Sequence, residues 1–173
     1  MRPIKTKFNG LLVFKGKTFY DQRGFLRETY KQKLIKKNLK FTILSKSKKN
    51  VLRGLHLQTK NSQAKYISVL KGKVLDVAVD LRKNSNTYKK HFKIILSDKN
   101  STSVFLPKGF AHGFLALDNE NIVMYGCSNY RSKIHERSIL WNDKDLKIKW
   151  GVKKPIVSKK DKKALSLKAF LKN

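Results

Sequence analysis

The sequence has little cysteine and no long apolar run, and each shortage excludes a class of protein. A single cysteine, Cys127, in 173 residues excludes an intrachain disulfide framework and a cysteine-based zinc cluster, and it suits a reducing compartment. No stretch approaches the ~20 apolar residues that cross a bilayer, and the first residues lack the apolar core of a signal peptide. We therefore expect a cytoplasmic protein with no membrane partner.

Acidic residues are also scarce, because only 11 aspartates and glutamates face 41 lysines and arginines, which leaves a net charge of +30. Such a charge commonly indicates a nucleic-acid or anionic-membrane partner. However, only seven of the basic residues are arginine, which is preferred for bidentate contacts to phosphates and bases, and the lysines are spread along the whole chain. We favour a lysine-rich surface with no specific nucleic-acid partner. A basic, nucleic-acid-binding barrel is the alternative from another functional class.

The hydrophobic pattern predicts one all-β domain over residues 1–173. The composition, 40% hydrophobic and 10% aromatic, is that of a folded chain, and no internal repeat or linker divides it. Alternation of Leu75, Val77 and Val79 with Asp76 and Ala78 predicts a half-buried strand. Short β-rich runs separated by turn residues predict a sandwich or barrel; they cover residues 11–14, 51–57, 66–70, 74–81, 92–96, 104–106, 114–117 and 122–127.

Two segments are predicted to be helical. The first covers residues 28–39 approximately. The second begins near Ser158, where Ser-Lys-Lys-Asp resembles a capping box, and it places Leu167, Phe170 and Leu171 on one face. Both helices are expected at the periphery of the β structure.

Histidines and cations gather around two motifs that resemble those of the cupin barrels. Residues 107–112 have the form Pro-x-Gly-x-x-His, and His56 lies on an earlier strand, where metal-binding cupins carry their first ligands. The place of a second histidine ligand holds Gln58 instead, and Arg53 and Lys65 are nearby. Protonated lysine and arginine donate hydrogen bonds and cannot bind a metal. We therefore expect a metal-free pocket that attracts an anion.

Such a pocket suits proton transfer at a carbon beside a ketone. A histidine can remove that proton only if a cation or donor stabilises the developing enolate oxygen. Inversion of the stereocentre then needs a second group that returns a proton to the opposite face. His56, Lys65 and Tyr125 supply a base, an enolate stabiliser and an acid.

Several ordered segments together resemble the dTDP-4-dehydrorhamnose 3,5-epimerase family over nearly the whole chain. They are residues 19–28 (FYDQRGFLRE), 45–58 (SKSKKNVLRGLHLQ), 73–85 (KVLDVAVDLRKNS), 107–114 (PKGFAHGF), 125–130 (YGCSNY), 136, 138–150 (SILWNDKDLKIKW) and 158–161 (SKKD). The resemblance implies a double-stranded β-helix, the cupin jelly-roll barrel, with short peripheral helices. It also implies epimerisation at C3, C5 or both of a dTDP-linked 4-keto-6-deoxyhexose.

The resemblance further implies residue roles and an assembly. His56 is the base, Tyr125 is the acid, and Asp161 orients and charges His56. Lys65 and Arg53 line the sugar site, and contacts to sugar or nucleotide come from Arg23, Glu28, His112, Glu136 and Lys160. Members of the family are homodimers without cofactor or metal, in which N-terminal residues of one subunit reach the site of the other.

Ordinary structural roles remain open for some of these residues. Asp161 also fits the third helical position of a capping box, and Tyr125 alternates with apolar neighbours, so it could be a core tyrosine with Tyr130 as the substitute acid. His112 could be structural in a tight turn. His56 could be a satisfied core histidine.

One departure from the family concerns recognition. Phe41 and Ile43 stand where the family usually presents a glutamine and an asparagine to the substrate. The change puts the nucleotide and the sugar in doubt more than the chemistry. A mono-epimerase of a GDP- or CDP-linked sugar is the rival within this chemistry, and an inactive sugar-nucleotide binder is a third alternative.

Overall fold

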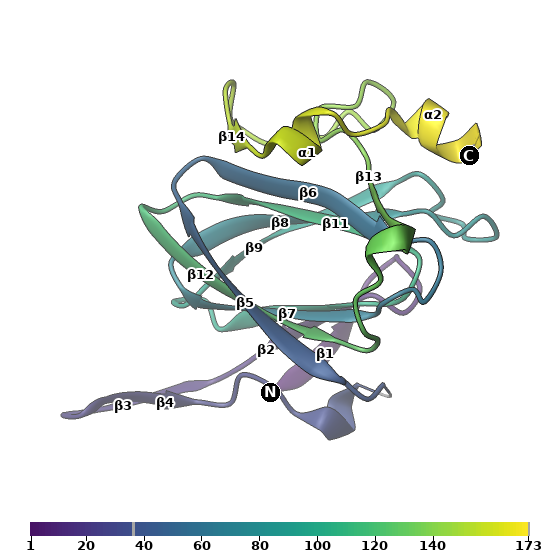
Figure 1. Cartoon of the computed structure of the whole chain (residues 1–173). Coiled ribbons are helices and arrows are strands. Elements are labelled where there is room, and N and C mark those ends of the chain that lie inside the picture. Colours follow the sequence, from purple (N-terminus) through teal and green to yellow (C-terminus); the bar gives the residue numbers. More distant parts are fainter. Residues whose placement is uncertain (36, 173) are drawn as a thin grey trace.

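Two sheets facing each other form a jelly-roll barrel (Figure 1). The computed structural model describes residues 1–35 and 37–172. The first sheet has the order β1 (Arg2–Lys5), β2 (Leu12–Lys15), β10 (Thr102–Leu106), β7 (Lys65–Lys71), β12 (Glu120–Cys127) and β5 (Phe41–Lys48). The second has the order β13 (Glu136–Ser138), β6 (Val51–Gln58), β11 (Phe110–Ala116), β8 (Lys73–Asp80) and β9 (His91–Ser97). The cupin architecture expected from the sequence is confirmed.

All eight β-rich runs of the sequence coincide with strands, three of them with one residue beyond a strand end, but the burial of one strand differs from the prediction. Leu75, Val77 and Val79 of β8 face the outer side of the second sheet, and the alternate residues, Asp76 and Asp80 among them, face inward with no exposed surface. The strand is therefore buried on both faces, not half-buried. Alternate side chains of β8 therefore lie in two different buried layers, because the C-terminal segment covers the outer face of this sheet.

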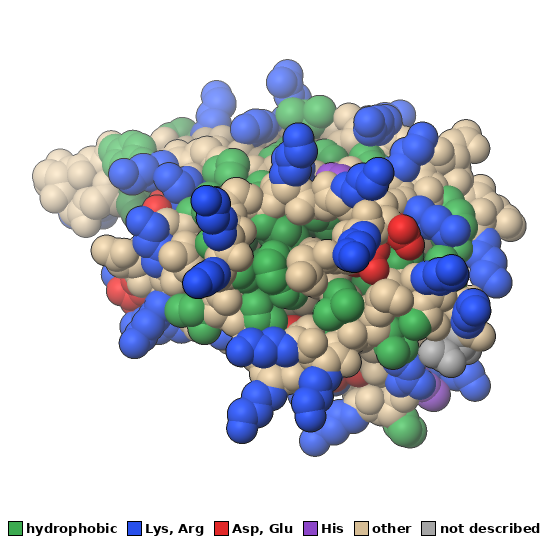
Figure 2. Space-filling model, turned by 90° about the horizontal axis from the view of Figure 1, so that it is seen from above, with side chains coloured by type: hydrophobic (Ala, Val, Ile, Leu, Met, Phe, Trp, Pro, Cys, Tyr) green, Lys and Arg blue, Asp and Glu red, His purple; other side chains and the backbone are tan. Residues whose placement is uncertain are grey.

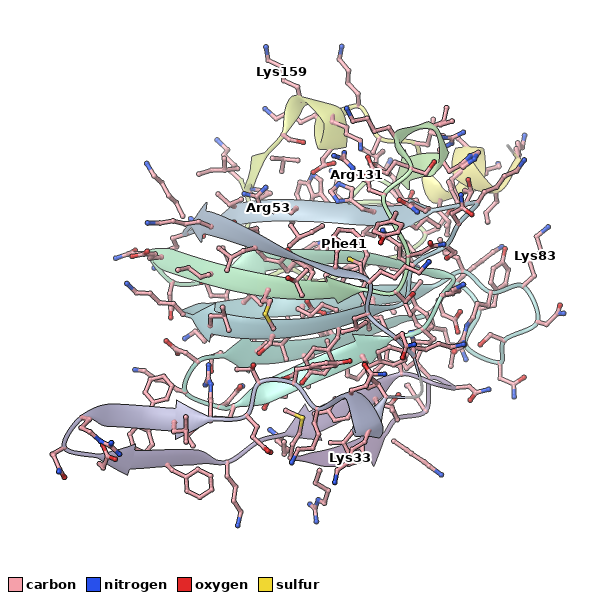
Figure 3. All side chains as sticks on the ribbon, turned by 60° about the horizontal axis from the view of Figure 1, so that its bottom comes forward. Lys33, Phe41, Arg53, Lys83, Arg131 and Lys159 are labelled. Carbon is pink, nitrogen blue, oxygen red and sulfur yellow. The ribbon has the colours of Figure 1, made fainter. Side chains whose placement is uncertain are left out.

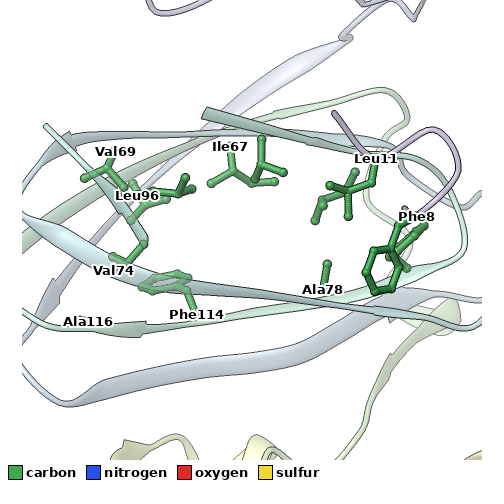
Figure 4. Close-up of a cluster of buried hydrophobic side chains, with 13 residues drawn as sticks. Phe8, Leu11, Ile67, Val69, Val74, Ala78, Leu96, Phe114 and Ala116 are labelled. Carbon is green, nitrogen blue, oxygen red and sulfur yellow. The ribbon is translucent and has the colours of Figure 1, made fainter. Parts of the chain in front are cut away.

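The hydrophobic core has two main layers. Between the sheets, Phe8, Leu11, Ile67, Val74 and Phe114 belong to one cluster of buried side chains (Figure 4). On the outer face of the second sheet, a second cluster joins strand residues to the C-terminal segment; it includes Leu55, Val77, Ile139, Trp150 and Leu167. In Figure 1 this segment, drawn in yellow, lies over β6. The second layer thus fixes residues 156–161 against the strand that carries His56.

The predicted helix over residues 28–39 is wrong. The structure has only a short 3₁₀ turn at Gln32–Leu34, flanked by extended backbone at Lys31 and Ile35; Lys36 lies outside the described residues. Ile35 is buried against the first sheet, and the hydroxyl of Tyr66 donates a hydrogen bond to the carbonyl of Thr29. Tertiary contacts therefore override the helical propensity of this lysine-rich stretch.

The C-terminal helix is confirmed at its start but is split in two. Ser158 caps α1 (Lys159–Lys162), because its hydroxyl accepts a hydrogen bond from the Asp161 amide. The chain then leaves the helical conformation before α2 (Leu167–Lys172) begins. A short parallel strand, β14 (Ile156–Val157), precedes α1 and pairs with β6. Among the described residues, no helix is long and apolar enough to cross a membrane.

A hairpin of β3 (Thr18–Asp21) and β4 (Gly24–Arg27) projects from the barrel (Figure 1). Its apolar side chains Phe19, Tyr20, Phe25 and Leu26 are all more than half exposed. Exposed apolar side chains this close together mark an interaction surface.

A close backbone approach joins β6 and β11 beside His56 and His112. Gly54 has φ +128°, and a Cβ atom built on it would lie 2.5 Å from the Cα of Gly113. The register of the two strands shifts between His112 and Phe114, next to this contact. The absence of two side chains therefore lets the two histidine-bearing strands pack closely.

We predict that Gly54→Ala lowers the free energy of unfolding by about 2–4 kcal/mol, because the methyl group adds a backbone clash to the strain of a positive φ. Gly151→Ala is the matched control, since Gly151 has φ +79° and no atom within 4 Å of its Cβ position. Urea unfolding of both variants measures the difference. Equal losses would show that the close approach to Gly113 contributes nothing.

Candidate functional site

A cavity of about 570 Å³ lies between the sheets and is closed on one side by the C-terminal segment. Its walls come from β5, β6, β7, β11, β12, β14 and α1. Eight of the ten predicted site residues line it: His56, Lys65, Tyr125, Asp161, Arg53, His112, Glu136 and Lys160. Residues distant in the sequence thus meet at one place.

His56 and Asp161 form a close carboxylate–imidazole pair. His56 Nε2 lies 2.6 Å from Asp161 Oδ1, and the Gly54 amide donates to Oδ2 at 3.4 Å. Burial alone would raise the pKa of Asp161, but the hydrogen bonds and charge of His56, with the Gly54 amide, bring it below its usual value. A charged carboxylate at Nε2 favours the proton on that nitrogen and leaves Nδ1 free to accept one. The capping position of Asp161 and its pairing with His56 coexist.

Tyr125 reaches the same cavity from the other sheet. Its ring contacts His112 edge-on, with centroids 6.0 Å apart, and its hydroxyl lies 3.3 Å from the hydroxyl of Ser45. Burial raises the pKa of the phenol above its ordinary value, although the hydrogen bond to Ser45 acts in the opposite direction. The phenol therefore keeps its proton at neutral pH, as an acid must before it donates. Tyr125 is both part of the core and part of the cavity wall.

Lys65 begins β7 opposite Cys127 and lines the cavity. Burial lowers the pKa of its ammonium group, and the neighbouring groups Cys127, Glu136 and Asp76 act in the opposite direction. A lysine at this depth can place an ammonium donor on a polar atom inside the cavity.

In the cavity wall, a second histidine pairs with a carboxylate. His112 Nε2 lies 2.7 Å from Asp76 Oδ2, and both side chains are buried. Asp76 Oδ1 has no hydrogen-bond partner among the described residues. His112 and His56 are direct cross-strand partners on β11 and β6. His112 thus lies in a strand and not in a turn, and two imidazoles stand side by side in the cavity wall, each with its own carboxylate.

A network of charges lies at one end of the cavity. Arg131 binds both carboxylate oxygens of Glu136, at 2.7 and 3.0 Å, and Lys160 donates to the same carboxylate at 2.9 Å. The hydrogen bond from Arg131, ahead of the contribution of Lys160, lowers the pKa of Glu136 to about 2. Arg53 is a third cation of the cavity wall, nearer the start of β6, where the Ser47 hydroxyl and the Lys46 carbonyl hold it. Figure 3 shows Arg53, Arg131 and Phe41 on one side of the barrel, with Lys83 well away from them.

Arg23 and Glu28 do not line this chain's own cavity. Arg23 lies at the tip of the β3–β4 hairpin, mostly exposed, and pairs with Asp21 at 2.6 Å. Glu28 pairs with Lys31 at 2.7 Å. Both residues belong to the N-terminal region that the family resemblance assigns to the partner's site.

The two departures at Phe41 and Ile43 lie on β5, at the free edge of the first sheet. Ile43 is the cross-strand neighbour of Tyr125 and forms part of the cavity wall. Phe41 instead stacks on Tyr130, with ring centroids 5.9 Å apart and an interplanar angle of 19°. Tyr130 is exposed and is not part of the cavity wall, so only Tyr125 lies where an acid could reach a bound substrate.

Gln58 stands at the place of a cupin metal ligand, but its side-chain amide forms hydrogen bonds to the backbone of neighbouring loops. Its amide nitrogen donates to the carbonyls of Asn61 and Tyr130, and its oxygen accepts from the Ser132 amide. Within residues 1–35 and 37–172, no group of three or more histidine, cysteine or acidic side chains is arranged to hold a metal ion.

The sequence analysis missed four polar residues at the site: Ser45, Gln63 and Arg131, which line the cavity, and Asp76 behind His112. Asp76 had a visible signal, because an aspartate inside a strongly apolar strand needs a partner if both faces are buried. Arg131 had a weaker one, since arginine is rare in this chain. Nothing in the sequence distinguishes Ser45 or Gln63.

The fold and the cavity define a cupin-type barrel with an acid–base site surrounded by cations. A family model described as dTDP-4-dehydrorhamnose 3,5-epimerase matches residues 5–169. The enzyme of that name from Shigella flexneri is 42% identical over 168 residues, with 93% of each chain covered. The chain belongs to the dTDP-4-dehydrorhamnose 3,5-epimerase family, whose members are sugar-nucleotide epimerases.

Solved structures agree with this assignment. The family enzyme of Bacillus anthracis, crystallised with TDP and pyrophosphate, superposes with a TM-score of 0.92 at 39% identity, and 96% of this chain and 99% of that one are covered. A Legionella pneumophila epimerase in complex with dTDP-4-keto-L-rhamnose gives 0.91 at 37% identity, with 96% and 93% covered.

We predict that Glu136 contributes to stability in an acid-dependent way. Because its folded-state pKa, about 2, lies below its ordinary value of 4.5, the contribution is complete above pH 4.5 and is lost as pH falls toward 2. Glu136→Gln should lower the free energy of unfolding by about 1–2 kcal/mol at pH 7, after discounting for solvent screening, and by much less near pH 2.5. Urea unfolding at several pH values measures the difference.

Glu28→Gln is the control, because Glu28 belongs to an exposed pair with Lys31 and should change stability little at any pH. A pH-independent loss in Glu136→Gln would contradict the assigned role of its charge.

Proposed function

We propose that this chain catalyses epimerisation at C3, C5 or both of a dTDP-linked 4-keto-6-deoxyhexose. The proposal is supported by the family assignment and by one geometric observation: His56 and Tyr125 come from opposite sheets and meet in one cation-lined cavity. A base and an acid on opposing walls fit a reaction that removes a proton from one face of a sugar ring and returns one to the other.

The proton transfer begins at His56. Nδ1 takes the proton from the carbon beside the ketone, and the C–H electron pair moves to the ketone oxygen to form an enolate. Asp161 stabilises the resulting imidazolium by its charge at Nε2. Lys65 donates a hydrogen bond to the enolate oxygen, which is where the negative charge develops.

Reprotonation completes the inversion. The enolate collapses, and the same carbon takes the proton of the Tyr125 hydroxyl from the opposite face. The enzyme is left with an imidazolium and a phenolate, and proton exchange with solvent restores both. Every proton and electron pair is thus supplied by this chain and water, so the reaction as proposed needs no cofactor or metal.

The nucleotide diphosphate is assigned to the cationic end of the cavity. Arg131 and Lys160 lie there on Glu136, and with Arg53 and Lys65 the cavity wall as a whole holds four lysine or arginine cations against the two carboxylates of Glu136 and Asp161. The excess of two positive charges matches the two negative charges of a nucleotide diphosphate sugar. His112 lines the sugar end beside His56.

A homodimer completes the proposal. The exposed apolar side chains of the β3–β4 hairpin need a covering partner, and the hairpin tip carries Arg23, for which this chain's own cavity has no place. A second copy that receives the hairpin gives both features a function, with Arg23 on the nucleotide and Glu28 nearby. The buried free thiol of Cys127 suits a reducing cytoplasm.

Hydrogen exchange in deuterated water tests the function. When the protein is incubated with dTDP-4-keto-6-deoxyglucose in D₂O, one deuterium should enter at each inverted carbon, as seen by NMR or mass spectrometry. Deuterium at both C3 and C5 defines a double epimerase, and deuterium at one carbon defines a mono-epimerase. No exchange at either carbon would refute the proposal.

His56→Asn should reduce the exchange rate by about 10²–10⁴-fold, because it replaces the base by a neutral amide that cannot take up the proton. His135→Asn is the matched control, since His135 lies outside the cavity wall. Full exchange in His56→Asn would refute the base assignment.

Tyr125→Phe tests the role of the acid independently of the base. His56 should still remove the proton and return a solvent deuteron to the same face, so the unreacted substrate should gain deuterium while epimerised product falls by about 10²-fold or more. Chiral analysis of the recovered sugar measures both. Inversion at the wild-type rate would exclude Tyr125 as the acid.

A further inference from the structure

Apart from Lys65, the lysines of the chain have no role in the proton transfers, and some of them are concentrated at the cavity. Five lysines, Lys153, Lys154, Lys159, Lys162 and Lys163, flank the cavity-lining residues 156–158, 160 and 161. We call these five the lysine collar. All five are exposed, and none makes a salt bridge within the described part of the chain.

The collar is not neutralised locally. The two carboxylates of the cavity wall are already engaged, Asp161 with His56 and Glu136 with Arg131 and Lys160. Glu120, another exposed acid, pairs with Lys46 and Lys71. Seen from above in Figure 2, the face is dominated by blue lysine and arginine side chains, with few red ones. An approaching anion therefore meets an unopposed positive field.

The collar residues are also close enough to act on the entrance. Lys159 and Lys162 lie within two residues of Lys160, on the same helical turn, and Lys154 lies two residues before Ile156. Cα atoms two residues apart are at most about 7.6 Å from each other, which is less than the Debye length of about 8 Å at physiological ionic strength. A charged cleft can raise the association rate of an oppositely charged ligand by about 10–10³-fold.

We propose that the lysine collar steers the dianionic nucleotide sugar into the cavity and increases its association rate. This inference depends on the proposed function for the identity of the ligand. The collar acts during the encounter and not in the reaction, so its removal should slow association and leave the dissociation rate and kcat nearly unchanged.

Stopped-flow binding of a fluorescent dTDP analogue tests the proposal. For the unmodified protein, the association rate should fall about tenfold or more between ionic strengths of about 0.02 and 0.5 M, and the dissociation rate should change less than threefold. K153Q/K154Q/K162Q should reduce the low-salt association rate about three- to tenfold and weaken its salt dependence.

A remote variant with the same charge change, K83Q/K90Q/K99Q, is the matched control. These three lysines are exposed, lie on the β8–β9 and β9–β10 connections and are not part of the cavity wall. Their removal should change the association rate less than twofold. Equal effects of the two variants, a salt-independent association rate or an effect confined to dissociation would overturn the collar proposal alone. Failure of the protein to bind dTDP and to exchange deuterium would overturn the proposed function with it.

Discussion

The hydrogen bond between His56 and Asp161 is the interaction on which the rest of the site depends. It joins a strand of the barrel to a helical turn more than a hundred residues later. That turn is positioned by the apolar layer that includes Ile139, Trp150 and Leu167, and by the pairing of β14 with β6. The C-terminal segment is therefore a third layer of the fold as well as a wall of the cavity.

Two buried acids explain how the barrel keeps its histidines in fixed orientations. Asp161 and Asp76 each accept from one imidazole, and the two imidazoles lie side by side on neighbouring strands. Buried carboxylates are costly unless they are paired, so these aspartates constrain the histidines strongly. The close glycine contact between β6 and β11 brings the two pairs together.

Much of the fold was predictable from the sequence because turn residues and apolar runs mark the central strands clearly. The helix at residues 28–39 was not, because its lysine-rich composition favours a helix while Ile35 and Thr29 make tertiary contacts that the sequence does not reveal. The burial of β8 was misjudged for a related reason. Asp76 and Asp80 look like a solvated face until the first sheet covers them, while the C-terminal segment buries the opposite face of β8.

The site was predictable where a motif carries its chemistry, as at His56 and His112. It was less predictable where a loop or a partner supplies the residue. Arg131 reaches the cavity from a connection without regular structure, and Arg23 lies on a hairpin directed away from its own barrel. The apolar Ile43 beside Tyr125 gives this cavity an apolar wall where the family resemblance led us to expect a polar side chain.

The central claim is that an imidazole and a phenol act on opposite faces of one sugar ring. A crystal structure of the protein with a bound dTDP-sugar tests it most directly. Our account predicts His56 Nδ1 on one face of the ring, the Tyr125 hydroxyl on the other, and Lys65 within hydrogen-bond distance of the oxygen at C4. Both side chains on the same face, or a sugar bound away from His56, would contradict it.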